Sequence, residues 1–283
     1  MLKNEGYYHS QRSRLSIKTK IVLILVTILL ISPLNSISSN NSFRNSKTKT
    51  KNKILSKLNR SLNQRSTVRV KTDLTLNNIK EIIKAHNDLR NQVAIGRTSK
   101  GNSLPQAGNM LQVYWSPTIA KGAQEWANRC AMNHSPRGQY TFKGKGLGEN
   151  IAFRGFSGNE SSSPFTQFVN DWFNEINDFN GNVGNFQSNG GPVTGHFTQV
   201  SWAESYLIGC GYCKTNKGGM TEEYLVCQYY NQGNYIGQPI YQVKNGNQCR
   251  CPQGYACKNK DYQGLCCPDA FNWCQKGSFL WTE

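Results

Sequence analysis

Ten cysteines constrain the fold of this 283-residue chain more than any other feature of its sequence. Their number is even and all lie in the second half of the chain, at Cys130, Cys210, Cys213, Cys227, Cys249, Cys251, Cys257, Cys266, Cys267 and Cys274. In an oxidising compartment, such a set predicts a disulfide framework. The six from Cys249 onward contain Cys-x-Cys and Cys-Cys motifs that also occur in metal clusters, but disulfides are the prediction for a secreted chain.

The N-terminus predicts the secretory route that a disulfide framework requires. Basic residues from Lys3 to Lys20 precede the apolar run IVLILVTILLI at 21–31. This run is shorter than the roughly 20 residues that span a bilayer. It therefore predicts a cleaved signal peptide over 1–38, with Ser36 and Ser38 near the cleavage position. An uncleaved anchor is the alternative, because the basic leader is long; after cleavage we expect a secreted, extracellular protein with no stable membrane span.

The formal charge of +17 is concentrated at one end of the chain. Residues 1–75 hold 15 Lys and Arg against 2 acidic residues, whereas residues 76–283 hold 18 against 14. The stretch 39–75 is biased to Ser, Asn and Lys with few apolar residues, which predicts a basic disordered spacer or pro-segment. Binding of anionic glycans or membranes by this segment is an alternative. The chain lacks a basic patch with interleaved aromatics, so nucleic-acid binding is not expected.

Three segments after the spacer have the apolar periodicity of amphipathic helices. They cover residues 75–94, 116–135 and 163–176. The expected N-caps are Thr75, Ser116 and Ser163, and a proline follows the second and third caps, as is common in the first turn of a helix. The second helix would carry Cys130 and His134 on its apolar side, and the third would carry Glu175 on its inward side.

Strand-like segments are rich in aromatic and β-branched residues and come mainly after the helices. They cover residues 110–115, 196–202, 206–212 and 222–230. This order predicts an α+β fold with a largely antiparallel sheet. We place the main domain at 76–240 and a cysteine-rich C-terminal extension at 241–283, which has little apolar periodicity and must be held by its cross-links.

Five segments in order resemble the hallmarks of the CAP superfamily of cysteine-rich secretory, antigen 5 and pathogenesis-related proteins. They are AHNDLRNQVA (85–94), WANRCAMNHS (126–135), GLGENIA (146–152), GHFTQVSW (195–202) and YLVCQYYNQGNY (224–235). The resemblance spans about residues 76–237 and implies an α-β-α sandwich with a mostly antiparallel central sheet. It also implies that Cys210 pairs with Cys227, which leaves Cys130 with Cys213, although four cysteines permit three pairings. The cysteine-rich tail is similar to the short extension of some members.

The resemblance brings together four residues that are far apart in the sequence. In the family, two histidines and two acidic residues line a central cavity, and the matching positions are His134, Glu149, Glu175 and His196. Such a set could hold a divalent cation, with His134 and His196 as zinc ligands, could act in general acid–base catalysis, or could be a structural network whose members satisfy one another. We favour the structural network over the metal site and the catalytic site. We therefore expect a protein that requires no cofactor.

Binding is the function that the resemblance favours. It implies a non-enzymatic secreted protein that binds lipids or sterols, or an extracellular effector that acts in defence, immunomodulation or venom. An extracellular protease or esterase that uses the His/Glu cavity is one alternative, although neither HExxH nor a nucleophile elbow is present. Recognition of a protein receptor or channel through the surface and tail is another. The Gly-rich segment 185–197 is the candidate ligand loop, and Asn159 is the candidate glycosylation site.

Overall fold

The computed structural model describes residues 74–157, 162–188, 191–246, 250–257 and 260–268. The predicted signal peptide, nearly all of the predicted spacer, Asn159, Cys249 and Cys274 lie outside the described residues. Among the helices that are described, none combines the length and the apolar character needed to cross a bilayer.

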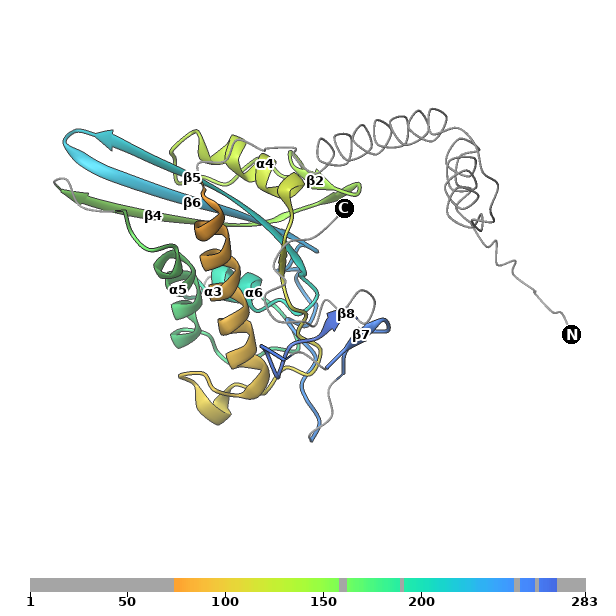
Figure 1. Cartoon of the computed structure of the whole chain (residues 1–283). Coiled ribbons are helices and arrows are strands. Elements are labelled where there is room, and N and C mark those ends of the chain that lie inside the picture. The colour runs from red at the N-terminus through yellow and green to blue at the C-terminus, as the bar shows by residue number, and fades with distance from the viewer. Residues whose placement is uncertain (1–73, 158–161, 189–190, 247–249, 258–259, 269–283) are drawn as a thin grey trace, which may run out of the picture. The chain divides into compact units, whose positions relative to one another are not determined.

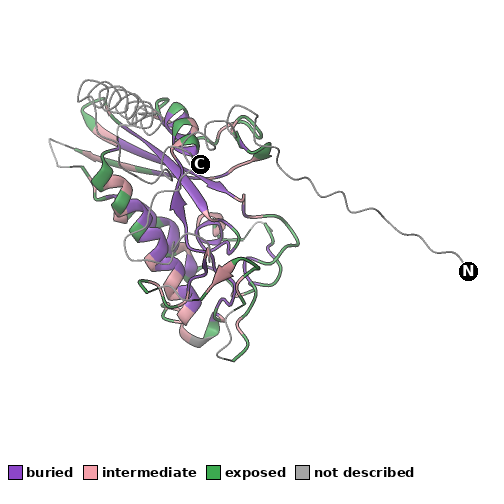
Figure 2. Cartoon of the chain, turned by 45° about the vertical axis from the view of Figure 1, so that its right-hand side comes forward, coloured by how far each residue is buried: buried purple, intermediate pink, exposed green. Residues whose placement is uncertain are grey.

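A four-stranded sheet in the order β1-β5-β6-β4 forms the centre of the fold. The strands are β1 (Tyr114–Trp115), β4 (Gly148–Ser157), β5 (Leu207–Lys217) and β6 (Met220–Tyr230). β6 pairs antiparallel with both β4 and β5, whereas the short β1 runs parallel to β5. The predicted mostly antiparallel sheet is therefore confirmed, and the central strands β5 and β6 are buried along most of their length (Figure 2).

Helices cover both faces of this sheet, which confirms the predicted α-β-α sandwich (Figure 1). One face carries α3 (Leu76–Ile95), α5 (Phe165–Asn174) and the short α6 (Gly195–Val200), and the other carries α4 (Pro117–Ala127). The smaller elements are the 3-10 turns η1 (Gly101–Ser103) and η2 (Glu175–Asn177), and the strand pairs β2 (Thr141–Phe142) with β3 (Lys145–Gly146) and β7 (Tyr255–Ala256) with β8 (Cys267–Pro268).

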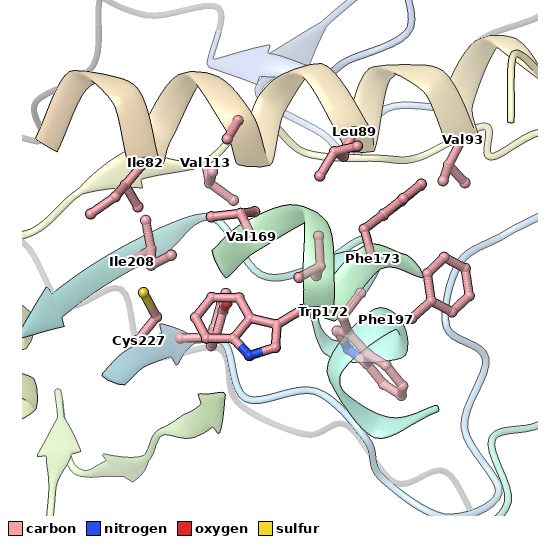
Figure 3. Packing of buried hydrophobic residues seen from close by; sticks show 14 of the residues in the cluster. Ile82, Leu89, Val93, Val113, Val169, Trp172, Phe173, Phe197, Ile208 and Cys227 are labelled. Atoms are coloured by element: carbon pink, nitrogen blue, oxygen red, sulfur yellow. The ribbon is translucent and has the colours of Figure 1, made fainter. Parts of the chain in front are cut away.

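The main core lies between the sheet and the face that carries three helices. Figure 3 shows Ile82, Leu89 and Val93 of α3 facing side chains of α5, with Ile208 and Cys227 of the sheet beneath them. Aromatic residues of α5 and α6 fill the centre, and Trp172 also donates its indole N–H to the carbonyl oxygen of Ile151 at 3.1 Å. Burial of these large side chains gives the fold its main stabilisation.

Two glycines let α4 pack directly on the opposite face of the sheet. A Cβ atom on Gly209 would lie 2.1 Å from the backbone nitrogen of Ala120, and one on Gly211 would lie 2.3 Å from the Cα atom of Gln124. The Gln124 side chain then bonds both backbone groups of Tyr212, at 2.8 and 3.0 Å. The glycines of the sequence IGCGY are therefore required by close helix-to-strand contact.

The predicted helix starts agree with the structure more closely than the predicted helix ends do. Thr75 caps α3 in a capping box with Asn78, and Ser116 caps α4 with Pro117 in its first turn, as predicted. α5 begins one residue later than predicted, after Pro164, because the backbone N–H of Ser163 donates to the buried carboxylate of Glu223 instead.

The predicted extent of the second helix is wrong at its C-terminus. α4 ends at Ala127, and Cys130 adopts a left-handed conformation with φ of 47°. Because such a residue cannot continue a right-handed helix, Cys130 and His134 lie in the loop that follows. They are therefore not part of the apolar face of this helix.

The predicted strand at 196–202 is also wrong, because this segment forms helix α6. Phe197 and Val200 are buried, and their i, i+3 spacing is that of a helix. A segment of seven residues is too short for its apolar pattern to distinguish the 3.6-residue period of a helix from the two-residue period of a strand. Packing of Phe197 against Phe173 and Phe179, with ring centroids 5.4 and 5.2 Å away, favours the helix. Conversely, the ten residues of β4 were not predicted as a strand, since the run from Gly148 contains Gly, Glu and Asn, which are depleted in strands.

The described part of the C-terminal extension is held by more than its cross-links. Leu265, Cys266 and Cys267 are fully buried, and Leu265 belongs to the main core. The backbone of Cys266 bonds that of Met110 at 2.7 Å and that of Gln112 at 2.9 Å. The extension therefore packs on the segment before β1 as part of the same folded body.

Arg90 lies at the point where α3, this segment and the turn after α6 meet. Its side chain is completely buried, and its guanidinium donates hydrogen bonds of 2.6–3.1 Å to the carbonyl oxygens of Leu111, Val200, Trp202, Ala203 and Ser205. Burial lowers the pKa of Arg90 to about 9, so the group stays protonated at neutral pH. The carbonyl dipoles take the place of a counter-ion.

We predict that Arg90→Met destabilises the protein by about 3 kcal/mol or more, because buried carbonyl groups lose their donors. Urea unfolding followed by circular dichroism measures the loss in the free energy of unfolding. The matched control is Lys84→Met on the exposed side of the same helix, whose ion pair with Asp88 is worth only about 0.5 kcal/mol. Equal stability of the two variants would refute this role of Arg90.

Candidate functional site

The four family-matched residues form two histidine–carboxylate pairs. His134 Nδ1 lies 3.0 Å from an oxygen of Glu149, and His196 Nδ1 lies 2.6 Å from an oxygen of Glu175. His134 lies in the loop after α4, Glu149 in β4, Glu175 at the end of α5 and His196 in the first turn of α6. Strand pairing and helix packing thus bring together residues that the sequence separates by 15 and 21 positions.

The pair of His134 and Glu149 lies at the surface but has a buried anchor. The imidazole is 63% exposed, whereas the Glu149 side chain is 8% exposed. Burial tends to raise the pKa of Glu149, but hydrogen bonds from His134, Gln228 and Ser135 outweigh burial and lower it. The hydrogen bond to Glu149 in turn raises the pKa of His134, against a smaller opposing effect of burial. This pair therefore favours an ionised carboxylate beside a protonated imidazole.

The pair of His196 and Glu175 is less exposed, with the side chains 24% and 17% exposed. The second oxygen of Glu175 accepts hydrogen bonds from the backbone N–H groups of His196 and Phe197, at 2.9 and 3.1 Å. The carboxylate thereby pairs two of the amide groups that begin α6, which have no partner within the helix. Trp172 stacks on the imidazole with ring centroids 6.3 Å apart, so the ring is held from both sides.

A buried hydrogen-bonded network supports the second pair from the core. Asn150 donates to the backbone oxygen of His196 at 3.1 Å and to the Tyr229 hydroxyl at 3.3 Å, and this hydroxyl lies 2.9 Å from Nε2 of His86. Burial lowers the pKa of His86 to about 4, so it is neutral at physiological pH. His86 and Asn150 were not among the predicted site residues, although both lie in segments that resemble the family hallmarks, AHNDLRNQVA (85–94) and GLGENIA (146–152).

The structure constrains how the four residues could hold a metal ion. Among the described residues, the group with three or more His, Cys, Asp or Glu ligand atoms within 4.8 Å of one another is Cys251, Cys257 and Cys266. Cys251 and Cys266 of that group form a disulfide. The two histidine–carboxylate pairs do not form such a group, so the fit to a metal rests on their Nε2 atoms. Each imidazole directs Nδ1 to a carboxylate. In zinc sites, the ring nitrogen that does not bind the metal commonly donates to a carboxylate in this way.

A cavity of about 650 Å³ lies beside the pair of His196 and Glu175. Two stretches line it, 178–188 and 191–195, the second of which leads directly into His196. Its apolar side chains are Phe179, Phe186, Pro192 and Val193, and Asn and Gln side chains provide most of its polar groups. The cavity thus falls largely within the candidate ligand loop 185–197.

The cysteine pairing in the described residues matches the pairing that the family resemblance implies. Cys210 of β5 is bonded to its cross-strand neighbour Cys227 of β6, and Cys130 after α4 is bonded to Cys213. A third bond joins Cys251 to Cys266 in the extension. The bond of Cys130 ties the loop that carries His134 to the sheet.

Comparison with known proteins agrees with this geometry. The family model described as the cysteine-rich secretory protein family, CAP, matches residues 83–229. The chain belongs to the CAP family. Its cysteine-rich C-terminal region contains the disulfide of Cys251 with Cys266.

Individual relatives have the same fold and similar sequences. The CAP chain is 39% identical to venom allergen 5 of Rhynchium brunneum over 58% of its own length and 72% of the relative. It is 36% identical to cysteine-rich secretory protein 3 of Equus caballus, over 66% and 67% of the two chains. Among solved structures, NaASP2 with Zn²⁺ superimposes with a TM-score of 0.53 and 29% identity, over 70% of this chain and 98% of the other.

We predict that the pKa of the His134 imidazole lies above 6.5 and falls toward that value in Glu149→Gln. The raised pKa means that the pair stabilises the folded protein fully below pH 6.5 and loses this contribution as the pH rises through the pKa of the folded state. NMR titration of the ring protons measures the shift directly. Glu222→Gln, which removes a partly exposed carboxylate paired with Lys217, is the control and should leave the pKa of His134 unchanged. A wild-type value at or below 6.5 would contradict this account of the pair.

Proposed function

We propose that this CAP protein is a secreted, non-enzymatic binding protein whose ligand is a lipid or sterol held in the cavity beside His196. The observation that carries the proposal is the cavity itself, whose volume lies within the range of small-molecule sites. Its apolar side chains suit a hydrocarbon body, and its Asn and Gln amides suit a hydroxyl or headgroup at one end. An effector role in the extracellular space is compatible with this binding.

The arrangement of the site supports binding rather than hydrolysis. The Ser135 hydroxyl, which adjoins His134, donates to Glu149 at 2.9 Å instead of to an imidazole. Both histidines direct Nδ1 to carboxylates that already accept several other hydrogen bonds. A nucleophilic mechanism needs a hydroxyl or thiol within hydrogen-bond reach of the general base, and the described contacts of His134 and His196 contain none.

We predict that the secreted protein carries a lipid or sterol and that Gly191→Trp weakens its binding at least tenfold. A Cβ atom on Gly191 meets no atom within 4 Å, so the indole can enter the cavity without displacing the backbone. Mass spectrometry of the co-purifying molecules identifies the ligand, and displacement of a fluorescent sterol or fatty acid measures affinity.

The control is Lys121→Trp, which adds the same bulk to an exposed position of α4 on the other face of the sheet. Its affinity should equal that of the wild type. A wild-type protein that carries no lipid and shows no saturable binding would end the lipid proposal, as would equal binding by Gly191→Trp.

A divalent cation is a second proposal, favoured by the geometry of the two imidazoles. His134 and His196 each direct Nδ1 to a carboxylate, which orients the imidazole ring. We propose that the Nε2 atom of each ring is then the zinc ligand. The solved structure of the similar protein NaASP2 is one with Zn²⁺. Water would complete the shell in a site with two protein ligands.

We predict that His134→Ala and His196→Ala each lower zinc affinity at least tenfold. Isothermal titration with Zn²⁺ and elemental analysis of the purified protein measure it, with Glu222→Gln as the control for loss of a surface carboxylate. Unchanged affinity in either histidine variant would exclude a site shared by the two residues.

A further inference from the structure

Three exposed apolar side chains lie on two neighbouring loops, one of which lines the cavity. Val193 and Ile236 are each 70% exposed, the highest values among the exposed large hydrophobic residues of the described chain, and Tyr235 is 48% exposed. Val193 also lines the cavity, whereas Ile236 and Tyr235 do not. Side chains as exposed as Val193 and Ile236 contribute little to the packing of the core, so their grouping on two bonded loops points to a contact outside the fold.

Hydrogen bonds hold the two loops together. The Asn234 side chain donates to the carbonyl oxygen of Gly195 at 2.8 Å, and the Gly237 backbone donates to that of Phe186 at 2.9 Å. Ile236 precedes Gly237, which is bonded to Phe186 of the cavity wall. Val193 lies two residues before Gly195, which is bonded to Asn234. We call the surface formed by Val193, Tyr235 and Ile236 the apolar rim.

The segments that carry the apolar rim lack formal charge. No Asp, Glu, Lys or Arg occurs from 179 to 203 or from 224 to 243, although 17% of the whole chain is charged. The polar residues there are mainly amides and hydroxyls, and the Tyr235 ring packs edge-on against Trp202 with centroids 6.5 Å apart. The basic residues of this protein are concentrated instead before residue 76.

We propose that the apolar rim inserts into the interfacial layer of a lipid bilayer and places the mouth of the cavity against the membrane. Aliphatic tips beside a tyrosine, on two segments without charged residues, suit the boundary between headgroups and acyl chains, and Asp178 of the cavity lining lies outside these segments. The basic segment before residue 76 adds attraction to anionic lipids through a separate part of the chain. The inference rests on the proposed lipid cavity, since the rim would let a lipid pass between membrane and protein.

A bilayer fits this surface better than a protein partner does. Energetically dominant residues of protein interfaces are enriched in Trp, Tyr and Arg, of which the rim has only Tyr235, and charged residues around them set register and specificity. The apolar rim offers neither cations nor carboxylates for that purpose. Insertion into a membrane needs only protruding apolar groups and a neutral surround.

The test is co-sedimentation of the full secreted chain with phosphatidylcholine vesicles in about 0.5 M salt, where the Debye length of roughly 4 Å screens the basic segment. We expect the wild type to sediment with the vesicles, and Ile236→Asp to partition at least tenfold more weakly. Met220→Asp is the matched control, because this apolar residue is 47% exposed at the turn between β5 and β6 and should partition as the wild type does.

Three outcomes would overturn the inference: a wild type that stays in solution with neutral vesicles, equal losses in the two Asp variants, or self-association that Ile236→Asp abolishes while vesicle binding persists. The cavity variant separates the two proposals, because Gly191→Trp should lose the soluble ligand and still bind vesicles. Ile236→Asp should conversely keep its affinity for a soluble fluorescent sterol. Failure of the rim would thus leave the cavity proposal standing.

Discussion

The buried guanidinium of Arg90 is the interaction on which much of this structure depends. A cation in an apolar interior is tolerated only when its donors are paired, and five carbonyl oxygens pair them here. One belongs to Leu111, in the segment on which the C-terminal extension packs, and the others belong to residues 200–205, at the end of α6 and directly after it. Arg90 therefore joins helix α3, the extension and the helix that carries His196, and the orientation of each depends on the others.

The candidate site combines a rigid side and an exposed side. His196 rests on a network that reaches through Asn150 and Tyr229 to the neutral, buried His86, whereas His134 extends into solvent from a loop held by the bond of Cys130 to Cys213. The two imidazoles thus have similar carboxylate partners but different surroundings. A ligand or ion that contacts both would meet one fixed group and one that adapts.

The two outer faces of this CAP protein have different chemistry. The surface ion pairs lie on α3, between β4 and α5 and along β5 and β6, whereas the cavity is lined mainly by amides, hydroxyls and apolar side chains, with Asp178 as the one carboxylate among the described lining residues. A largely uncharged lining suits an uncharged, poorly soluble ligand, since few charged groups lose water on binding. The proposed lipid site and the proposed membrane contact of the apolar rim both rest on this separation.

Local signals in the sequence determined the parts of the fold that depend on neighbouring residues. Capping by Thr75 and Ser116, the strands at 206–212 and 222–230, the α+β class and the four His and Glu residues were all predictable, the last through their match to the family motifs. Tertiary packing alone decided the rest. The segment 195–200 is a helix because Phe197 packs against two distant rings, β4 is a strand because β6 pairs with it, and the extension is ordered by contact with the segment before β1. Each outcome depends on partners remote in the chain, which no local pattern encodes.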